Sequence, residues 1–157
     1  MKVGLVSPGE KSPWCGGSIL TILHILTAAH CTYDSSIENI KAPASIQVLV
    51  GEHDTSDSVA DFHNVSKIAN HPKFNHDNAD YDFSILTLTT PINFSSKACP
   101  ICLPASVASL YTGQVATVTG WGDTGADGSP ASTLQEVDVI VESNEKCNDY
   151  YSGKIKE

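Results

Sequence analysis

The chain has 157 residues, of which 41% are hydrophobic, so it can bury a core as one domain or as two small barrels. Its formal net charge is −9, from 18 acidic residues against nine basic ones, all of them lysine. This balance argues against nucleic-acid binding and against attraction to an anionic membrane surface, because both need clustered cationic side chains. The sequence has no repeat period or low-complexity tract, which excludes solenoid and collagen-like architectures.

The opening residues and the longest apolar stretch are each too short for a targeting or membrane-spanning segment. The first ten residues, MKVGLVSPGE, reach a Ser-Pro-Gly turn too soon to hold the core of a signal peptide. The stretch from Ile19 to Ala29 is interrupted by Thr21, His24 and Thr27 and falls short of a membrane span.

Short β-rich runs separated by turn residues dominate the chain, and their spacing predicts a sandwich or a barrel. The predicted strands are Ser18 to Leu26, Ile46 to Val50, Val65 to Ala69, Phe83 to Leu88, Gln114 to Thr119 and Leu134 to Val141. The loops at Gly51 to Asp61, His71 to Asp80 and Gly122 to Ser132 are rich in Asp, Ser, Asn and Gly, which favour turns.

The segment from Leu134 to Val141 alternates apolar and polar residues over most of its length, which indicates a strand with one buried face. After it, residues 143–150 can form a short helical turn, with Ser143 or Asn144 as the N-cap and Glu145 near the start. Pro100 and Pro104 mark a connector between an earlier and a later β-rich segment. We therefore expect a boundary there, between residues 1–104 and 105–157.

The five cysteines are Cys15, Cys31, Cys99, Cys102 and Cys147. Cys99 and Cys102 form the one CxxC pair, but Pro100 lies between them and no second pair follows, so zinc is disfavoured. Disulfides are the better interpretation. The odd count means that at least one cysteine is free or has its partner outside this chain.

The strongest signal is the pair of segments WCGGSIL at 14–20 and LTAAHC at 26–31. They resemble the chymotrypsin/trypsin family of serine peptidases (peptidase S1), in which such segments bracket the catalytic histidine. The resemblance implies that His30 is this histidine and that a Cys15–Cys31 disulfide clamps the loop that presents it. Histidine suits general-base work because its ordinary pKa lies near operating pH. A packed core histidine is the other interpretation, which the matches on both sides disfavour.

The second matching segment is NADYDFSILTL at 78–88, which resembles the family's strand carrying the catalytic aspartate. The register implies Asp82 for this role, because the apolar strand follows it directly. A carboxylate entering an apolar strand is costly to bury unless it is paired, and a histidine Nδ1–H supplies that pairing. Asp80 competes for the same role from two residues earlier, but a loop aspartate that caps a turn is the preferred interpretation for it.

Further matches extend the resemblance over nearly the whole chain. They are CPICLP at 99–104, GWG at 120–122, LQEV at 134–137 and the segment from Cys147 to Ile155. The resemblance implies an all-β, trypsin-like double β-barrel. The first barrel is expected to be nearly complete in residues 1–104, with His30 and Asp82, and the second only partly present in residues 105–157.

Two smaller matches carry expectations of their own. We expect Gly120 and Gly122 to allow close backbone approach around Trp121. Tyr151 matches a tyrosine that borders the primary specificity pocket in trypsin-like members. This match points to cleavage after basic residues.

The family's nucleophile lies in a GDSGGP motif, which this sequence does not contain. Ser129 lacks the neighbouring glycines that would supply two oxyanion donors, and Ser18 belongs to the strand before the histidine, so neither is expected to be the nucleophile. An amino-terminal IVGG-type segment is also missing. We therefore expect a fragment truncated at both ends, with the partners of Cys102 and Cys147 outside it and Cys99 unassigned.

The loop that begins at Gly51 resembles the calcium loop of trypsins, with Glu52 as one oxygen ligand and Asp61 as a second. Calcium takes six or more oxygens, and the second acidic position is displaced from the family pattern. A solvated acidic loop is therefore the favoured interpretation, and no other cofactor is expected. The histidines at 53, 63, 71 and 76 lack zinc-site spacing and are expected to be surface residues.

Together these features predict a secreted serine endopeptidase that acts on protein or peptide substrates and is open to protein inhibitors, with no nucleic-acid or membrane partner. The resemblance implies that His30 takes the serine's proton and returns it to the leaving amine, while Asp82 fixes the imidazole tautomer. Because the nucleophile is missing, we expect the 157-residue chain alone to lack triad-dependent proteolysis.

Two alternatives belong to other functional classes. A non-catalytic serine-protease homologue would be a secreted binding or regulatory module on the same fold, but retention of both His30 and Asp82 argues against it. An unrelated extracellular β-barrel adhesive module would make the TAAHC, DFSIL and GWG matches coincidental in order and spacing. N-x-S sequons at Asn64 and Asn93 fit an extracellular surface. A half-built second barrel would expose strand edges, which predicts poor solubility.

Overall fold

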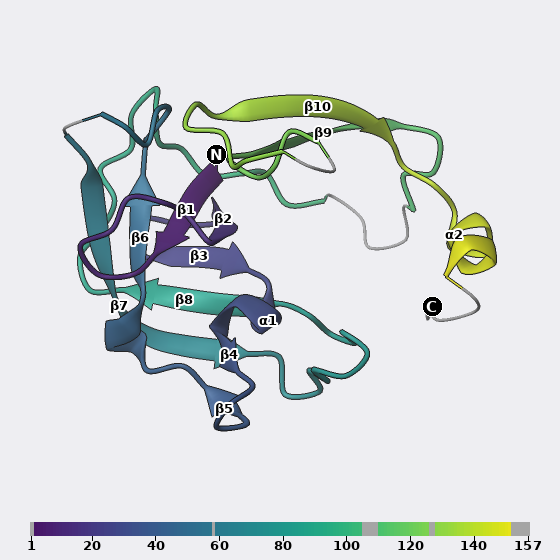
Figure 1. The fold of residues 1–157 in the computed structure, drawn as a ribbon, viewed down its shortest axis with the longest axis horizontal. Coiled ribbons are helices and arrows are strands. Elements are labelled where there is room, and N and C mark those ends of the chain that lie inside the picture. Colours follow the sequence, from purple (N-terminus) through teal and green to yellow (C-terminus); the bar gives the residue numbers. More distant parts are fainter. Residues whose placement is uncertain (1, 58, 105–109, 126–127, 152–157) are drawn as a thin grey trace.

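The computed structural model describes residues 2–57, 59–104, 110–125 and 128–151, and it is built almost entirely of short strands (Figure 1). Its strands are β1 (Lys2–Val6), β2 (Cys15–Ile19), β3 (His24–Thr27), β4 (Tyr33–Asp34), β5 (Asn39–Ile40), β6 (Gln47–Val50), β7 (Asp61–Asn70), β8 (Ser84–Leu88), β9 (Val115–Gly120) and β10 (Gln135–Ile140). Its helices are α1 (Ala29–Thr32) and α2 (Asn144–Tyr150), with a 3₁₀ turn at Pro43–Ser45. The all-β prediction is confirmed.

Six of these strands close into an antiparallel barrel in the order β1, β2, β3, β8, β7, β6. Successive residues of a strand point to opposite faces, so alternate side chains enter the barrel. In β8, for example, Ser84, Leu86 and Leu88 are buried. The core consists of Val3, Leu5, Ile19, Ile25, Ile46, Val48, Val50, Val65, Leu86, Leu88, Ile92 and Ala98. The first barrel is therefore complete within the part of the chain before the predicted boundary.

Two predictions about the barrel strands were wrong. The run from Ser18 to Leu26 is not one strand, because the chain turns between β2 and β3, where the hydroxyl of Thr21 accepts hydrogen bonds from the backbone N–H groups of Leu23 and His24. β1 is absent from the predicted strands, yet it pairs with both β2 and β6 and closes the barrel. Its sequence, KVGLV, lies among the opening residues, and all of its residues after Lys2 are buried.

The second sheet contains β9 and β10, which pair antiparallel over their full lengths (Figure 1). The second barrel is thus only partly present, as predicted. The prediction of a buried face on β10 is wrong, because every residue of this strand is exposed. Val137, on its apolar face, is 57% exposed. The alternation indicates which face is apolar, but burial also requires a layer that packs against that face, and the described residues supply none.

The second sheet is joined to the barrel by a few specific contacts. Trp121 is buried, and its Nε1–H donates to the backbone oxygen of His53 at 3.2 Å. The side-chain ammonium of Lys2 donates to the backbone oxygen of Thr119 and lies 2.8 Å from where a Cβ on Gly120 would be. The space at Gly120 is therefore used by a lysine side chain and not by close backbone approach, and a Cβ on Gly122 would meet nothing within 4 Å, so the expectation for these glycines was wrong.

The short helix α2 agrees with its prediction. Its N-cap is Ser143, whose hydroxyl accepts a hydrogen bond from the backbone N–H of Lys146 at 3.2 Å, and Glu145 lies in the first turn. This cap satisfies one of the free N–H groups at the start of the helix. Neither helix of the described residues has the length and apolar content needed to cross a bilayer.

We expect Gly17→Ala to destabilise the barrel by about 1–3 kcal/mol, because overpacking a filled interior forces backbone shifts. A Cβ at this position would lie 2.8 Å from Ile25 Cγ2 and 2.9 Å from the backbone oxygen of Leu26, and that oxygen belongs to a paired strand and cannot move aside. Urea unfolding measures the change. Gly122→Ala is the matched control, expected to stay within about 0.5 kcal/mol of the parent; equal effects of the two substitutions would contradict this packing.

Candidate active site

His30 and Asp82 meet because of how β3 pairs with β8. These strands are antiparallel neighbours, and Thr27 at the end of β3 lies opposite Ser84 at the start of β8. The residues that follow β3 and those that precede β8 therefore leave the barrel at the same end. His30 lies in α1, just after β3, and Asp82 lies just before β8. The register thus brings together two residues that are far apart in sequence.

The Asp82 carboxylate binds His30 through both of its oxygens. The distance from His30 Nδ1 to Asp82 Oδ2 is 2.7 Å, and the backbone N–H of His30 donates to Asp82 Oδ1 at 2.8 Å. The His30 side chain is 57% exposed and that of Asp82 is 22% exposed. The imidazole is therefore held on its Nδ1 side, while much of the ring faces solvent.

Two opposing effects set the pKa of Asp82. Partial burial of the carboxyl raises the pKa, but the hydrogen bonds from the side chain and backbone of His30, with the charge interaction, outweigh that effect. The pKa of Asp82 consequently lies below its ordinary value. The carboxylate is thus the favoured form at neutral pH, and it is the form that accepts a hydrogen bond from Nδ1–H.

The predicted disulfide between Cys15 and Cys31 is present, with a Cα–Cα distance of 6.2 Å. It links β2 to the residue that follows His30 and so restrains α1 covalently. In the chain-entropy model, a disulfide that closes a loop of this length lowers the conformational entropy of the unfolded chain and so stabilises the fold by about 3 kcal/mol. Cys99, Cys102 and Cys147 are free among the described residues, and their pairing stays a prediction.

Lys41 holds the end of α1, a role that the sequence did not reveal. Its backbone N–H donates to the oxygen of Thr32 at 2.8 Å, and its ammonium donates to the oxygen of Cys31 at 3.0 Å. The ammonium also lies 4.3 Å from the centre of the Trp14 ring. A lysine that binds the last carbonyls of a helix satisfies acceptors that have no partner within the helix.

Thr32 anchors the underside of α1. Its side chain is fully buried, and its hydroxyl lies 2.6 Å from Asn70 Oδ1 on β7 and 2.9 Å from the backbone oxygen of Ala29. The short helix has no side-chain N-cap, so these contacts, the disulfide and Lys41 supply its support. The His30 backbone is therefore fixed independently of the imidazole's bond to Asp82.

The other predicted site residues lie elsewhere. Asp80 accepts a hydrogen bond from the Asn78 side chain at 3.2 Å within its own loop, so Asp82, not Asp80, reaches His30. Ser18 lies within β2, opposite Leu26, and Ser129 is exposed in the loop after Trp121. No hydroxyl among the described residues hydrogen bonds to His30. Tyr151 is exposed at the C-cap of α2.

The four remaining histidines of interest do not share one environment. His53 and His76 are exposed, as predicted, and His71 is half-buried, stacked on Tyr81 with ring centres 4.6 Å apart. His63 is buried, contrary to the prediction, because it points into the barrel end beside Thr90, with its Nδ1 3.1 Å from the Thr90 hydroxyl.

Among the described residues, the potential metal ligands that gather in groups of three or more are Cys15, His30 and Cys31. The disulfide removes both thiolates from that group.

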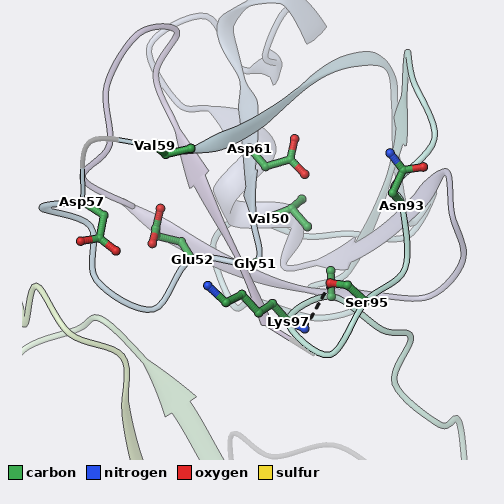
Figure 2. A pocket seen from close by; sticks show the side chains of 10 residues that line it. Val50, Gly51, Glu52, Asp57, Val59, Asp61, Asn93, Ser95 and Lys97 are labelled. Atoms are coloured by element: carbon green, nitrogen blue, oxygen red, sulfur yellow. Dashed lines mark hydrogen bonds between the residues drawn. The ribbon is translucent and has the colours of Figure 1, made fainter.

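The calcium candidates Glu52 and Asp61 line one hollow of about 440 Å³, together with Asp57 (Figure 2). The ligand atoms of these three carboxylates do not gather within 4.8 Å of one another. Figure 2 also shows the Lys97 side chain extending across the hollow toward Glu52, and an ammonium there competes with a cation. As arranged, these residues do not gather as calcium ligands do, and the interpretation as a solvated acidic loop stays a prediction.

Comparison with known proteins agrees with this geometry. The family model described as Trypsin matches residues 2–157. The chain belongs to the trypsin family. Trypsin-1 of Astacus astacus is 38% identical over 147 residues, which cover 92% of this chain and 60% of that protein. Trypsin of Sus scrofa is 35% identical over 153 residues, covering 96% of this chain and 61% of that protein.

A venom serine protease of Polistes dominula is 33% identical over 154 residues, covering 95% of this chain and 53% of that protein. This trypsin-family chain therefore spans between about half and three-fifths of the length of these curated relatives. The matches place it among the serine proteases by family. The segment they share with it includes both His30 and Asp82.

We expect Asp82→Asn to lower the free energy of unfolding at neutral pH by about 1.5–3 kcal/mol, the usual range for a hydrogen bond to a charged group. Because the folded-state pKa of Asp82 is depressed, its contribution is fully present above the ordinary aspartate value, near about 3.9, and is lost as pH falls below it. The difference in the free energy of unfolding between the parent and Asp82→Asn should therefore become smaller as the pH is lowered. Urea unfolding at a series of pH values measures it.

Asp80→Asn is the control for this measurement, since Asp80 lies in the same segment and bonds to Asn78 within its own loop. We expect it to stay within about 0.5 kcal/mol of the parent throughout. A difference between Asp82→Asn and the parent that is constant with pH would contradict the assigned role of the carboxylate.

Proposed function

We propose that this chain supplies the general base and its orienting carboxylate for a serine endopeptidase that cleaves protein substrates. The observation that carries the proposal is the 2.7 Å contact between His30 Nδ1 and Asp82 Oδ2 at one end of the barrel. Membership of the trypsin family supports it. Because the chain spans only part of its relatives' length, the activity is proposed for the whole protein that contains it.

The geometry assigns a distinct part to each residue. A carboxylate can only accept hydrogen bonds, so the imidazole nitrogen that faces Asp82 must carry the hydrogen. That places the lone pair of the neutral ring on Nε2, the nitrogen that can take a proton from a hydroxyl. The ring becomes cationic when it does so, and the adjacent Asp82 charge stabilises that cation.

Peptide cleavage then follows in two steps. A serine hydroxyl supplied by the rest of the protein loses its proton to His30 Nε2 and attacks the peptide carbonyl, and His30 returns the proton to the leaving amine. Water hydrolyses the acyl-enzyme with the same assistance. In this scheme Asp82 stays ionised throughout, which agrees with the direction of its pKa shift.

Substrate class and location complete the proposal. Two of the similar proteins are named trypsin, which supports cleavage after basic residues, in agreement with the match at Tyr151. We also propose that the protein enters the secretory pathway. The Cys15–Cys31 disulfide supports this, because such bonds persist in oxidising compartments, and one relative is a venom protease.

The proposal predicts how His30→Ala and Asp82→Asn change peptidase activity. The measurement uses the longest natural polypeptide that contains this sequence. His30→Ala and Asp82→Asn should each lower kcat for a peptide ester ending in arginine by about 10⁴-fold or more, with a smaller change in KM. These magnitudes are those known for enzymes with this triad. Asp80→Asn is the matched control and should retain nearly full activity.

The 157-residue chain alone is a second control, expected to show no His30-dependent turnover. Turnover that survives His30→Ala in the longer polypeptide, or that is equally sensitive to Asp80→Asn, would contradict the proposal. A longer polypeptide that folds, binds a peptide inhibitor and hydrolyses nothing would favour the non-catalytic homologue instead.

A further inference from the structure

The two N-x-S sequons of the chain occupy different structural settings. Asn64 is the first residue of one sequon and lies inside the ten-residue strand β7. Asn93 is the first residue of the other and lies beyond the end of β8, outside every strand. A glycosylated asparagine is typically found in an accessible surface loop, so these settings have different consequences.

Asn64 is fixed on both sides of its strand. Its side-chain oxygen accepts a hydrogen bond from Gln47 Nε2 at 2.8 Å, from the residue opposite it on β6. Its backbone oxygen accepts a hydrogen bond from the N–H of Thr89 at 2.8 Å. The backbone of Asn64 is therefore held extended, and both its side chain and its backbone oxygen are bonded to neighbouring segments.

Asn93, by contrast, does not lie in a strand. It is exposed, and no hydrogen bond among the described residues uses its side chain. Its neighbour Ile92 is 2% exposed and is anchored by a hydrogen bond from its N–H to the oxygen of Ile22. Two residues on, Ser95 forms a tight turn with Ala98 through reciprocal backbone bonds of 2.8 and 3.2 Å. The asparagine is thus presented between two fixed points.

The position of Asn93 is also compatible with the proposed active site. Asp82 precedes β8 and Asn93 follows it, so the strand, which spans roughly 17 Å at about 3.3 Å per residue, separates them. Figure 2 shows Asn93 at the edge of the hollow that contains Glu52 and Lys97, on its own loop. A bulky group on this asparagine would cover that hollow and leave His30 accessible.

We propose that Asn93 carries an N-linked oligosaccharide and that Asn64 does not. The donor is an oligosaccharide joined to a lipid through pyrophosphate. The Asn93 amide nitrogen forms a bond to the first carbon of the sugar, the bond from that carbon to the pyrophosphate oxygen breaks, and the lipid pyrophosphate leaves with the electron pair. The amide nitrogen loses one proton to the transferase.

The inference rests on the proposed entry into the secretory pathway and does not depend on the proposed catalysis. For the test, the chain is fused to a cleavable secretion leader and produced in insect cells. The leader directs the chain into the secretory pathway, so the result does not depend on its natural targeting. The protein is then treated with peptide N-glycosidase in heavy-oxygen water. A shift in gel mobility after treatment shows that a glycan was attached, and mass spectrometry of the treated protein locates it. The enzyme converts a modified asparagine into labelled aspartate, which identifies the residue.

We expect labelled aspartate at position 93 and one gel shift, lost in Asn93→Gln and kept in Asn64→Gln. Ser95→Ala should also abolish the shift, because it removes the sequon and leaves the asparagine in place. Asn93 found unmodified in chain recovered from the secretory pathway would overturn the proposal, as would modification confined to Asn64. Loss of peptidase activity in the kinetic test has no bearing on any of these outcomes.

Discussion

The proposed function depends on two hydrogen bonds between His30 and Asp82. One carboxylate oxygen of Asp82 accepts from the backbone N–H of His30, and the other binds its ring nitrogen Nδ1. This interaction fixes the orientation and the tautomer of an imidazole whose side chain is otherwise more than half exposed. The interaction exists because β3 and β8 are paired in one register, and a slip of one residue would turn the side chains of β8 to the other face and move the adjacent Asp82 away from His30. The disulfide, Lys41 and Thr32 then hold α1 in place against the barrel.

The division of the fold explains why the chain contains the whole of the proposed catalytic pair but only part of a second barrel. Both residues come from the closed barrel, whose core is formed before the predicted boundary. The β9–β10 sheet contacts that barrel through Lys2 and Trp121 and otherwise leaves apolar residues such as Val137 exposed. An exposed apolar sheet with free edges is a surface prone to association, which agrees with the expectation of poor solubility.

Motifs with several matching residues predicted the site well, whereas isolated patterns did not. His30, Asp82 and the Cys15–Cys31 disulfide could be identified because the segments around them resemble those of the trypsin family, whereas the cap at Ser143 followed from the chemistry of helix starts. The role of Lys41 could not be identified, because an isolated lysine in a loop has no periodicity and its partners are set by tertiary packing. Likewise, His63 is buried by its register on β7, which single-residue polarity does not reveal.

Nitrogen-edited NMR of the His30 imidazole tests the central claim most directly, since it reports which ring nitrogen carries the hydrogen. For the neutral ring, the account predicts hydrogen on Nδ1, none on Nε2, and a far-downfield Nδ1–H signal that depends on the Asp82 carboxylate. A neutral ring with its hydrogen on Nε2, or a downfield signal that persists after the carboxylate is replaced by an amide, would contradict the account.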